Sequence, residues 1–107
     1  MTKHDVRSNM NVAKTAIQTD SGDEWVLGYF LQEHMGEDGK TLYGLRVDKS
    51  TPDGVLVERE ETPALTESHE AAMAMVQAFA KGAVPPMVLL EMTDEWCSES
   101  MDVLLPI

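Results

Sequence analysis

Histidine is the side chain best suited to metal or proton chemistry, and the sequence has three: His4, His34 and His69. A transition-metal site needs two or more ligands on one helix face or on neighbouring strands. No two of these histidines stand at such a spacing, so the sequence predicts no metal site and no cofactor. Acidic residues surround His34 and could hold a metal weakly: Glu33, Glu37 and Asp38. We interpret this cluster as the solvated tip of a hairpin.

The single cysteine, Cys97, is a poor candidate for a nucleophile. A reactive thiol needs neighbouring cations or a helix N-terminus that favours its thiolate form. The neighbours of Cys97 are instead Asp94, Glu95 and Glu99, and these carboxylates favour the protonated thiol. A chain with one cysteine also forms no intramolecular disulfide and no multi-cysteine zinc site.

Other catalytic patterns are also missing from the sequence. The run Gly36–Thr41 ends in GKT like a phosphate-binding loop, but His34 stands where that loop needs its first glycine. A serine nucleophile elbow would require GxSxG, which does not occur. The sequence therefore predicts no catalytic residue and favours a non-catalytic protein. A small ligand-binding protein or enzyme remains an alternative, which a pocket with converging polar groups would support.

The charge balance limits the kinds of partner. The chain has 8 Lys and Arg against 19 Asp and Glu, for a net charge of −11. The bases are scattered, so no basic patch is available to neutralise nucleic-acid phosphates, and the net charge repels an anionic membrane. We predict no binding to nucleic acid or to membranes. Residues 60–107 hold nine acidic groups and one base, Lys81, which predicts an acidic surface. Such a surface suits a basic protein partner or loosely held divalent cations, or it serves only to keep the chain in solution.

The length of 107 residues fits one domain. We expect a single domain over 1–107, with residues 1–9 as a disordered polar tail. The first ten residues lack the apolar core of a secretory signal. No apolar run approaches the roughly 20 residues that span a bilayer. We therefore expect a cytoplasmic protein.

Alternating apolar residues predict strands in the first half of the chain. The clearest run is 24–35, in which Gly28 marks either the weak point of the strand or a place where something packs close to the backbone. Runs at 40–49 and 55–60 flank Thr51-Pro52-Asp53-Gly54, a strong turn signal. A weaker strand is predicted at 11–19. These segments predict an antiparallel meander of three or four strands, with 41–49 and 55–60 paired across the turn.

The apolar period changes to that of a helix after Pro63. Thr66 or Ser68 can cap a helix that ends at Gly82, the residue we expect in the left-handed conformation. Pro86 suits the first turn of a second helix. The two helices would turn apolar residues to the core: Ala72, Met73, Val76, Phe79 and Ala80 in the first, Val88, Leu89, Met92 and Trp96 in the second. The predicted fold class is α+β, with both helices packed on one face of the sheet.

Three short motifs follow one another between Tyr43 and Trp96: Tyr43-Gly44-Leu45-Arg46-Val47, the helix start at Thr66–Ser68, and Val84-Pro85-Pro86 leading into Leu90-Glu91. In this order they resemble an uncharacterised small-protein family of Firmicutes, a domain of unknown function. The resemblance covers about half of the chain. It implies a bacterial cytoplasmic protein without a known activity, and it supplies no catalytic residues.

These observations favour a small non-catalytic protein-interaction or regulatory module. Its partner would be another protein or a second copy of the chain. The predicted partner contacts are apolar: Trp96, Val103, Leu104, Leu105 and Ile107. An alternative is an acidic mimic of nucleic acid that inhibits a DNA-binding protein, whose binding would weaken steeply with salt, unlike apolar docking.

The apolar end of the chain gives a direct prediction. Deleting residues 101–107 is expected to lower the stability of the domain or to convert an oligomer into a monomer. Each apolar side chain that becomes fully buried contributes at most roughly 1.5–3 kcal/mol. Thermal melts and light scattering on the truncated protein would test this, and values equal to those of the full chain would contradict it.

Overall fold

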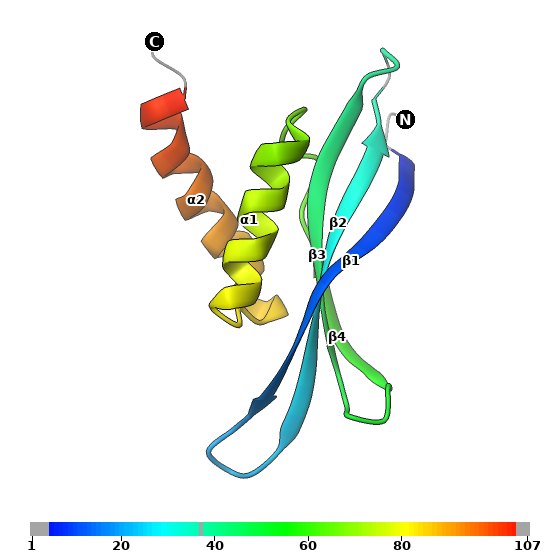
Figure 1. The fold of residues 1–107 in the computed structure, drawn as a ribbon, viewed down its shortest axis with the longest axis vertical. Coiled ribbons are helices and arrows are strands. Elements are labelled where there is room, and N and C mark those ends of the chain that lie inside the picture. The colour runs from blue at the N-terminus through cyan, green and yellow to red at the C-terminus, as the bar shows by residue number, and fades with distance from the viewer. Residues whose placement is uncertain (1–4, 37, 105–107) are drawn as a thin grey trace.

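The computed structural model describes the backbone of residues 5–36 and 38–104 and the side chains of residues 8–36 and 38–96. Four strands come first, and helices follow (Figure 1). The elements in chain order are β1 (Asp5–Gln18), β2 (Glu24–Met35), β3 (Thr41–Ser50), β4 (Leu56–Glu61), α1 (His69–Lys81), the short 3₁₀ helix η1 (Pro86–Val88) and α2 (Leu89–Leu104). The predicted α+β class is confirmed.

The strands form one antiparallel sheet in the order β1-β2-β3-β4. The predicted meander is thus confirmed, with four strands. Its last hairpin turns at Thr51–Gly54, where Gly54 has a φ of 97° that an L-residue rarely adopts. The predicted pairing of 41–49 with 55–60 across this turn is confirmed, and the ladder runs from Arg46 opposite Glu61 to Ser50 opposite Leu56.

The first strand extends beyond its predicted start. β1 begins at Asp5, so residues 5–9, expected in a disordered tail, pair with the C-terminal half of β2. Hydrogen bonding to the neighbouring strand β2 extends β1 here, because the local sequence has no apolar alternation: Ser8, Asn9 and Asn11 are polar. The register shifts between Val6 and Ser8 and again between Asn11 and Ala13, which marks two irregularities along the strand.

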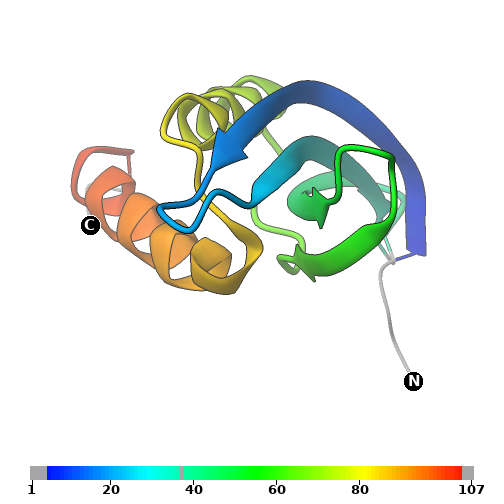
Figure 2. The same cartoon turned by 90° about the horizontal axis from the view of Figure 1, so that it is seen from below.

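The core lies between the sheet and the helices, which pack on the same side of it (Figure 2). Alternation along β2 turns Leu27, Tyr29 and Leu31 towards α1, which contacts β1, β2 and β3. The buried apolar residues are Leu27, Tyr29, Leu31, Leu45, Val47, Ala72, Met75, Val76, Phe79, Val84 and Leu89. Among the described residues, no helix covers the other face of the sheet.

The helix α1 begins where a side chain caps it. The Ser68 hydroxyl accepts a hydrogen bond from the Ala71 amide at 3.0 Å, as the predicted cap requires. The predicted left-handed residue is wrong: Gly82 has a φ of −87°, and Ala83 has a φ of 52° instead. The turn comes one residue later because the Gly82 and Val84 amides return to carbonyls of the last helical turns.

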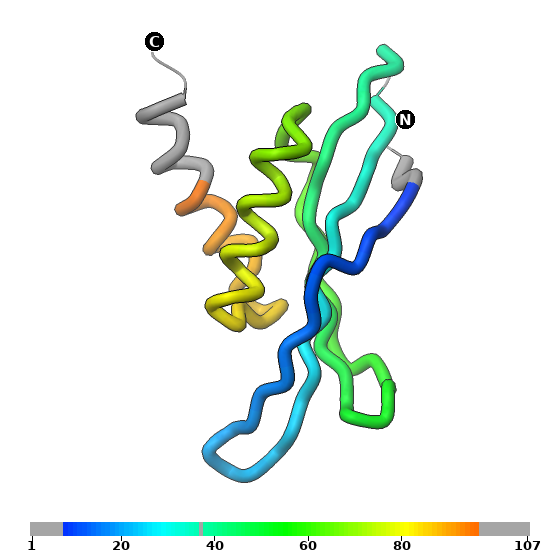
Figure 3. Tube along the Cα trace, viewed as in Figure 1, coloured from blue at the N-terminus to red at the C-terminus, as the bar shows by residue number. Residues whose placement is uncertain are grey.

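The second helix is joined to the first by an aromatic pair. The rings of Phe79 and Trp96 meet edge to face, with their centroids 5.9 Å apart. Near its start, α2 also contacts η1 and β4. The backbone trace shows the hairpin turns of β1–β2 and β3–β4 extending past the helices at one end (Figure 3). Both hairpins therefore lie outside the part of the sheet that the helices cover.

A buried tyrosine connects the sheet to the helical half. Tyr29 is fully buried, and its hydroxyl donates to the Val84 carbonyl at 2.9 Å. Burial raises the pKa of Tyr29 from 10.0 to about 12. The neutral phenol is therefore favoured in the folded state.

Folding stability should consequently fall between pH 10 and about pH 12. Below this range the phenol is neutral in both states, whereas within it the unfolded chain loses the proton first. Thermal melts across this range should show a larger loss for the natural chain than for Tyr29→Phe. The variant itself should lose about 1 kcal/mol at neutral pH, because the Val84 carbonyl loses its donor. Equal pH dependence of the two proteins would contradict the argument.

Candidate functional site

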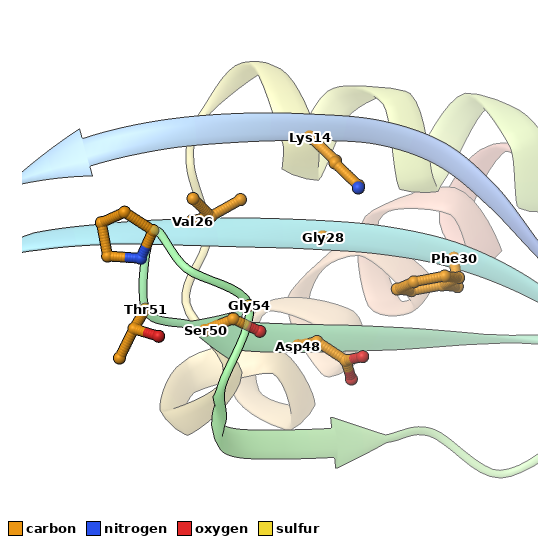
Figure 4. A pocket seen from close by; sticks show the side chains of 9 residues that line it. Lys14, Val26, Gly28, Phe30, Asp48, Ser50, Thr51 and Gly54 are labelled. Carbon is orange, nitrogen blue, oxygen red and sulfur yellow. The ribbon is translucent and has the colours of Figure 1, made fainter.

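The uncovered face of the sheet, here called the open face, contains a hollow of about 430 Å³. Its side chains point away from the helices, which lie behind the sheet (Figure 4). Three strands and the β3–β4 turn line it: Lys14 of β1, Val26, Gly28 and Phe30 of β2, Asp48 and Ser50 of β3, and Thr51, Pro52 and Gly54.

The floor of the hollow is a glycine in the centre of the sheet. Gly28 pairs with Lys14 on one side and Asp48 on the other. A Cβ at this position would lie 3.2 Å from the Phe30 ring, so the ring occupies the space beside the glycine. Of the two interpretations that the sequence left open for Gly28, close packing against the backbone is the one observed, and the Phe30 ring supplies it. The missing side chain leaves the hollow open between Lys14 and Asp48.

Asp48 connects one wall of the hollow to an ion-pair network across two strands. Asp48 accepts from Arg46 Nη2 at 3.1 Å, from Arg59 Nε at 2.8 Å and from Arg59 Nη2 at 3.1 Å. The side chains of Asp48 and Arg46 are only 12% and 14% exposed, and that of Arg59 is 42% exposed. Hydrogen bonding to Asp48 raises the pKa of Arg59. The carboxylate is therefore held by two guanidinium groups.

The same network also fixes the aromatic ring. The Arg46 guanidinium carbon lies 4.0 Å from the centroid of the Phe30 ring, a cation–π contact. The register makes this possible, because Phe30 pairs with Arg46 and Gly28 pairs with Asp48. Neighbouring residues of the open face thus hold each other in place.

Beyond Phe30, the segment after β4 covers the same face of β2 and buries its side chains. Gln32 is 1% exposed and donates to Glu61 Oε2 at 2.5 Å, and His34 is 6% exposed. Pro63 and Thr62 lie against Gly44, next to His34. The interpretation of His34 as part of a solvated hairpin tip is therefore wrong. The segment after β4 folds over this end of β2. The residues around position 34 contain no signal that predicts this contact.

Lys14 lines the hollow and forms no ion pair with the described residues. Within the described residues, Arg46 and Arg59 pair with Asp48, and Lys40 lies 3.9–4.0 Å from two carboxylates. In the same part of the chain, Lys14 makes no ion pair, and its side chain extends towards β2 (Figure 4). The hollow thus combines a free ammonium group, an aromatic ring and a neutralised carboxylate.

The comparisons with known proteins give a family for this chain. The model of a family of unknown function, DUF6514, matches residues 8–99. The chain belongs to DUF6514. No curated protein and no solved structure shows a significant match. The resemblance to a domain of unknown function is therefore confirmed, and the DUF6514 match includes every residue that lines the hollow.

The predicted partner contacts lie elsewhere. Trp96 is half-buried at the end of the DUF6514 match, with its ring against Phe79 in the core. Val103 and Leu104 form the last backbone positions of α2, and their side chains lie outside the described part. Leu105 and Ile107 lie outside the described residues altogether. All four of these apolar residues follow the matched range of 8–99.

The structure gives two further findings on metals and membranes. Among the described residues, no group of three or more His, Cys, Asp or Glu is placed to hold a metal ion. His69 begins α1, where its ring lies edge-on to Tyr43 with centroids 5.3 Å apart. In that same part of the chain, no helix has the length and apolarity needed to cross a membrane.

Proposed function

We propose that this DUF6514 chain is a small non-catalytic protein-interaction module, and that the open face around the hollow recognises its partner. The observation that carries this proposal is the network of Arg46, Asp48, Arg59 and Phe30 on a face without a covering helix. Charged side chains that are already held lose little conformational entropy when a partner binds. Such a surface is preorganised for recognition.

Charge indicates which partner surface fits. Asp48 is neutralised by two guanidinium groups, and Lys14 adds a free positive charge. Lys14 is therefore the charge at the hollow that stays available to a partner, in a chain whose net charge is −11. A partner that presents acidic side chains is complementary to it. Repulsion from acids elsewhere on the chain is screened beyond about 8 Å at physiological salt.

The geometry of Asp48 supports a non-catalytic role. A general base must be within hydrogen-bond reach of a substrate proton. Both oxygens of Asp48 already accept from Arg46 or Arg59. The side chain therefore acts as a fixed structural charge.

The test compares two arginine substitutions that add the same charge. Ser50→Arg fills the hollow with a long side chain and so blocks entry of a partner side chain despite the favourable added charge, whereas Gln77→Arg adds the same charge on the exposed side of α1. Each protein is immobilised and used to capture partners from cells that express the natural chain, and a captured protein is then purified and its affinity measured. We expect a partner that binds the natural chain and Gln77→Arg equally and binds Ser50→Arg at least tenfold more weakly. Equal binding to both variants would overturn the proposal.

The same proteins distinguish the alternatives. A nucleic-acid mimic would use its acidic side chains, so neutralising the exposed Glu91, Asp94 and Glu95 of α2 would abolish capture. A second copy of the chain as the partner would double the mass in light scattering, and Ser50→Arg would reverse this. Binding of a different protein through the open face predicts that capture survives the neutralisation of these three acids and that the purified chain alone keeps its monomer mass.

The proposal includes a bacterial cytoplasmic location, which the single cysteine supports, since cytosolic proteins rarely rely on disulfides.

Nucleic acid should not bind to the open face, although it has an aromatic ring and cations. With a net charge of −11, the chain neutralises few phosphates, and phosphate neutralisation supplies most nonspecific affinity. We expect no detectable binding of single-stranded DNA or RNA at about 0.15 M salt, a condition under which the phosphate contribution is already weakened. Fluorescence anisotropy with labelled oligonucleotides measures this. Micromolar affinity would contradict it.

A further inference from the structure

We propose that the hollow is a carboxylate subsite, in which Lys14 pairs with the carboxylate of an aspartate or glutamate side chain of the partner. This inference rests on the proposed function, because the carboxylate is presented by the protein that binds the open face. It names the chemical group recognised and the residue that recognises it.

The first argument is the charge left unpaired at the hollow. Arg46 and Arg59 share Asp48, whereas Lys14 makes no ion pair with the described residues. The chain has 19 acidic residues, yet none in the described part pairs with this lysine. An incoming carboxylate would therefore bind Lys14 without breaking an existing pair.

The second argument is the supply of hydrogen-bond donors. Ser50 lines the same hollow, and its hydroxyl makes no side-chain hydrogen bond within the described part of the chain. The neighbouring Thr51 is already used, since its hydroxyl binds Asp53 and accepts from the Val55 amide. An ammonium group and a free hydroxyl at one hollow favour an anion over a cation. The carboxylate of Asp48 does not reverse this, because it is engaged by both arginines.

The third argument is the apolar part of the hollow. Val26, Phe30 and Pro52 supply carbon surface beside Lys14, and the absent side chain of Gly28 leaves depth between them. A glutamate or aspartate side chain has a short aliphatic stem that would lie on this surface while its carboxylate reaches the ammonium group. Phosphate or sulfate lacks such a stem. The shape therefore favours an aliphatic carboxylate.

Nuclear magnetic resonance titration of the ¹⁵N-labelled full chain tests the subsite. Propionate reproduces the glutamate side chain, and propionamide has the same shape without the charge. Sodium chloride at equal concentration controls for ionic strength. We expect propionate to shift the amide signals of Lys14, Gly28 and Ser50, with propionamide and chloride producing less than a fifth of the shift.

Two lysine variants show whether Lys14 is the residue responsible. Lys14→Gln should weaken propionate binding about three- to fivefold, the range expected for an exposed ion pair. Lys81→Gln removes another lysine that makes no ion pair in the described part of the chain, on α1, and should leave binding unchanged. Equal shifts with propionamide, or unchanged binding by Lys14→Gln, would overturn the inference.

The failure of this inference can be told apart from failure of the proposed function. If Ser50→Arg loses the partner while propionate does not bind at Lys14, the open face still recognises a protein and only the carboxylate subsite is wrong. If Ser50→Arg still binds the partner as tightly as the natural chain, the proposed function is wrong. The inference that Lys14 binds a carboxylate of the partner is then wrong too, even when propionate binds at the hollow.

Discussion

Replacing Gly44 by alanine should destabilise the domain by about 3 kcal/mol, since overpacking and broken hydrogen bonds both contribute. A Cβ at Gly44 would lie 2.8 Å from the Pro63 carbonyl oxygen, 3.0 Å from Thr62 Oγ1 and 3.2 Å from His34 Nε2. Two of these atoms cannot move easily, because the Thr62 hydroxyl accepts from the Leu45 amide and donates to the Pro63 carbonyl. Relief of the clash would therefore break this hydrogen-bonded segment.

Gly82→Ala is the matched control. The nearest atom to a Cβ at Gly82 is the Ala78 carbonyl oxygen at 3.6 Å, an ordinary contact, and φ is −87°. Alanine there should change stability by less than about 1 kcal/mol, because it reduces the freedom of the unfolded chain without strain. Urea melts of both variants measure the difference. Similar midpoints for Gly44→Ala and Gly82→Ala would contradict the crowding at Gly44.

The second large effect is expected at the open face. Asp48→Ala should cost about 2–3 kcal/mol, because Arg46 and Arg59 would then face each other without a carboxylate. The Arg46 side chain is 14% exposed, so water replaces only part of the lost contact. The exposed Asp20 in the β1–β2 turn is the control, and its alanine variant should stay within about 0.5 kcal/mol of the natural chain.

A double-mutant cycle separates the network from a general loss of charge. In a chain that already carries Arg59→Ala, removal of Asp48 should cost less than in the natural chain, since one of its partners is gone. Additive effects would show that the pair is not coupled. Equal losses for Asp48→Ala and Asp20→Ala would show that the network does not stabilise the fold.

The local parts of the fold could be predicted from the sequence because each has a local physical cause. The turn at Thr51–Gly54 depends on proline, aspartate and glycine in adjacent positions, and the cap of α1 depends on the Ser68 hydroxyl. Features that depend on distant residues were missed. His34 is buried because the segment after β4 folds against Gly44, and nothing near residue 34 encodes that contact.

The candidate site was harder to predict because both faces of β2 contain mostly apolar residues. Leu27 and Tyr29 face the helices, whereas Val26 and Phe30 face the hollow, and the residue types do not show which face a helix covers. The position of Lys14 opposite Gly28 depends on the register of β1, which is shifted between Asn11 and Ala13. Such a shift moves every later side chain by one place. Only the fold therefore brings these residues together.

The edges of the sheet have a consequence for behaviour at high concentration. The strands β1 and β4 leave unpaired backbone groups that can template intermolecular cross-β growth. At the start of β4, the exposed residues Val55, Leu56 and Val57 form a short apolar, β-branched-rich run of the kind that favours aggregation. The register shift opposite Lys49 and Ser50 interrupts the straight strand at this run, and charged side chains follow it from Glu58 to Glu61. The two shifts in β1 distort the opposite edge in the same way. These irregularities keep native molecules from adding to one another strand by strand, so the chain should resist fibril formation for as long as it stays folded.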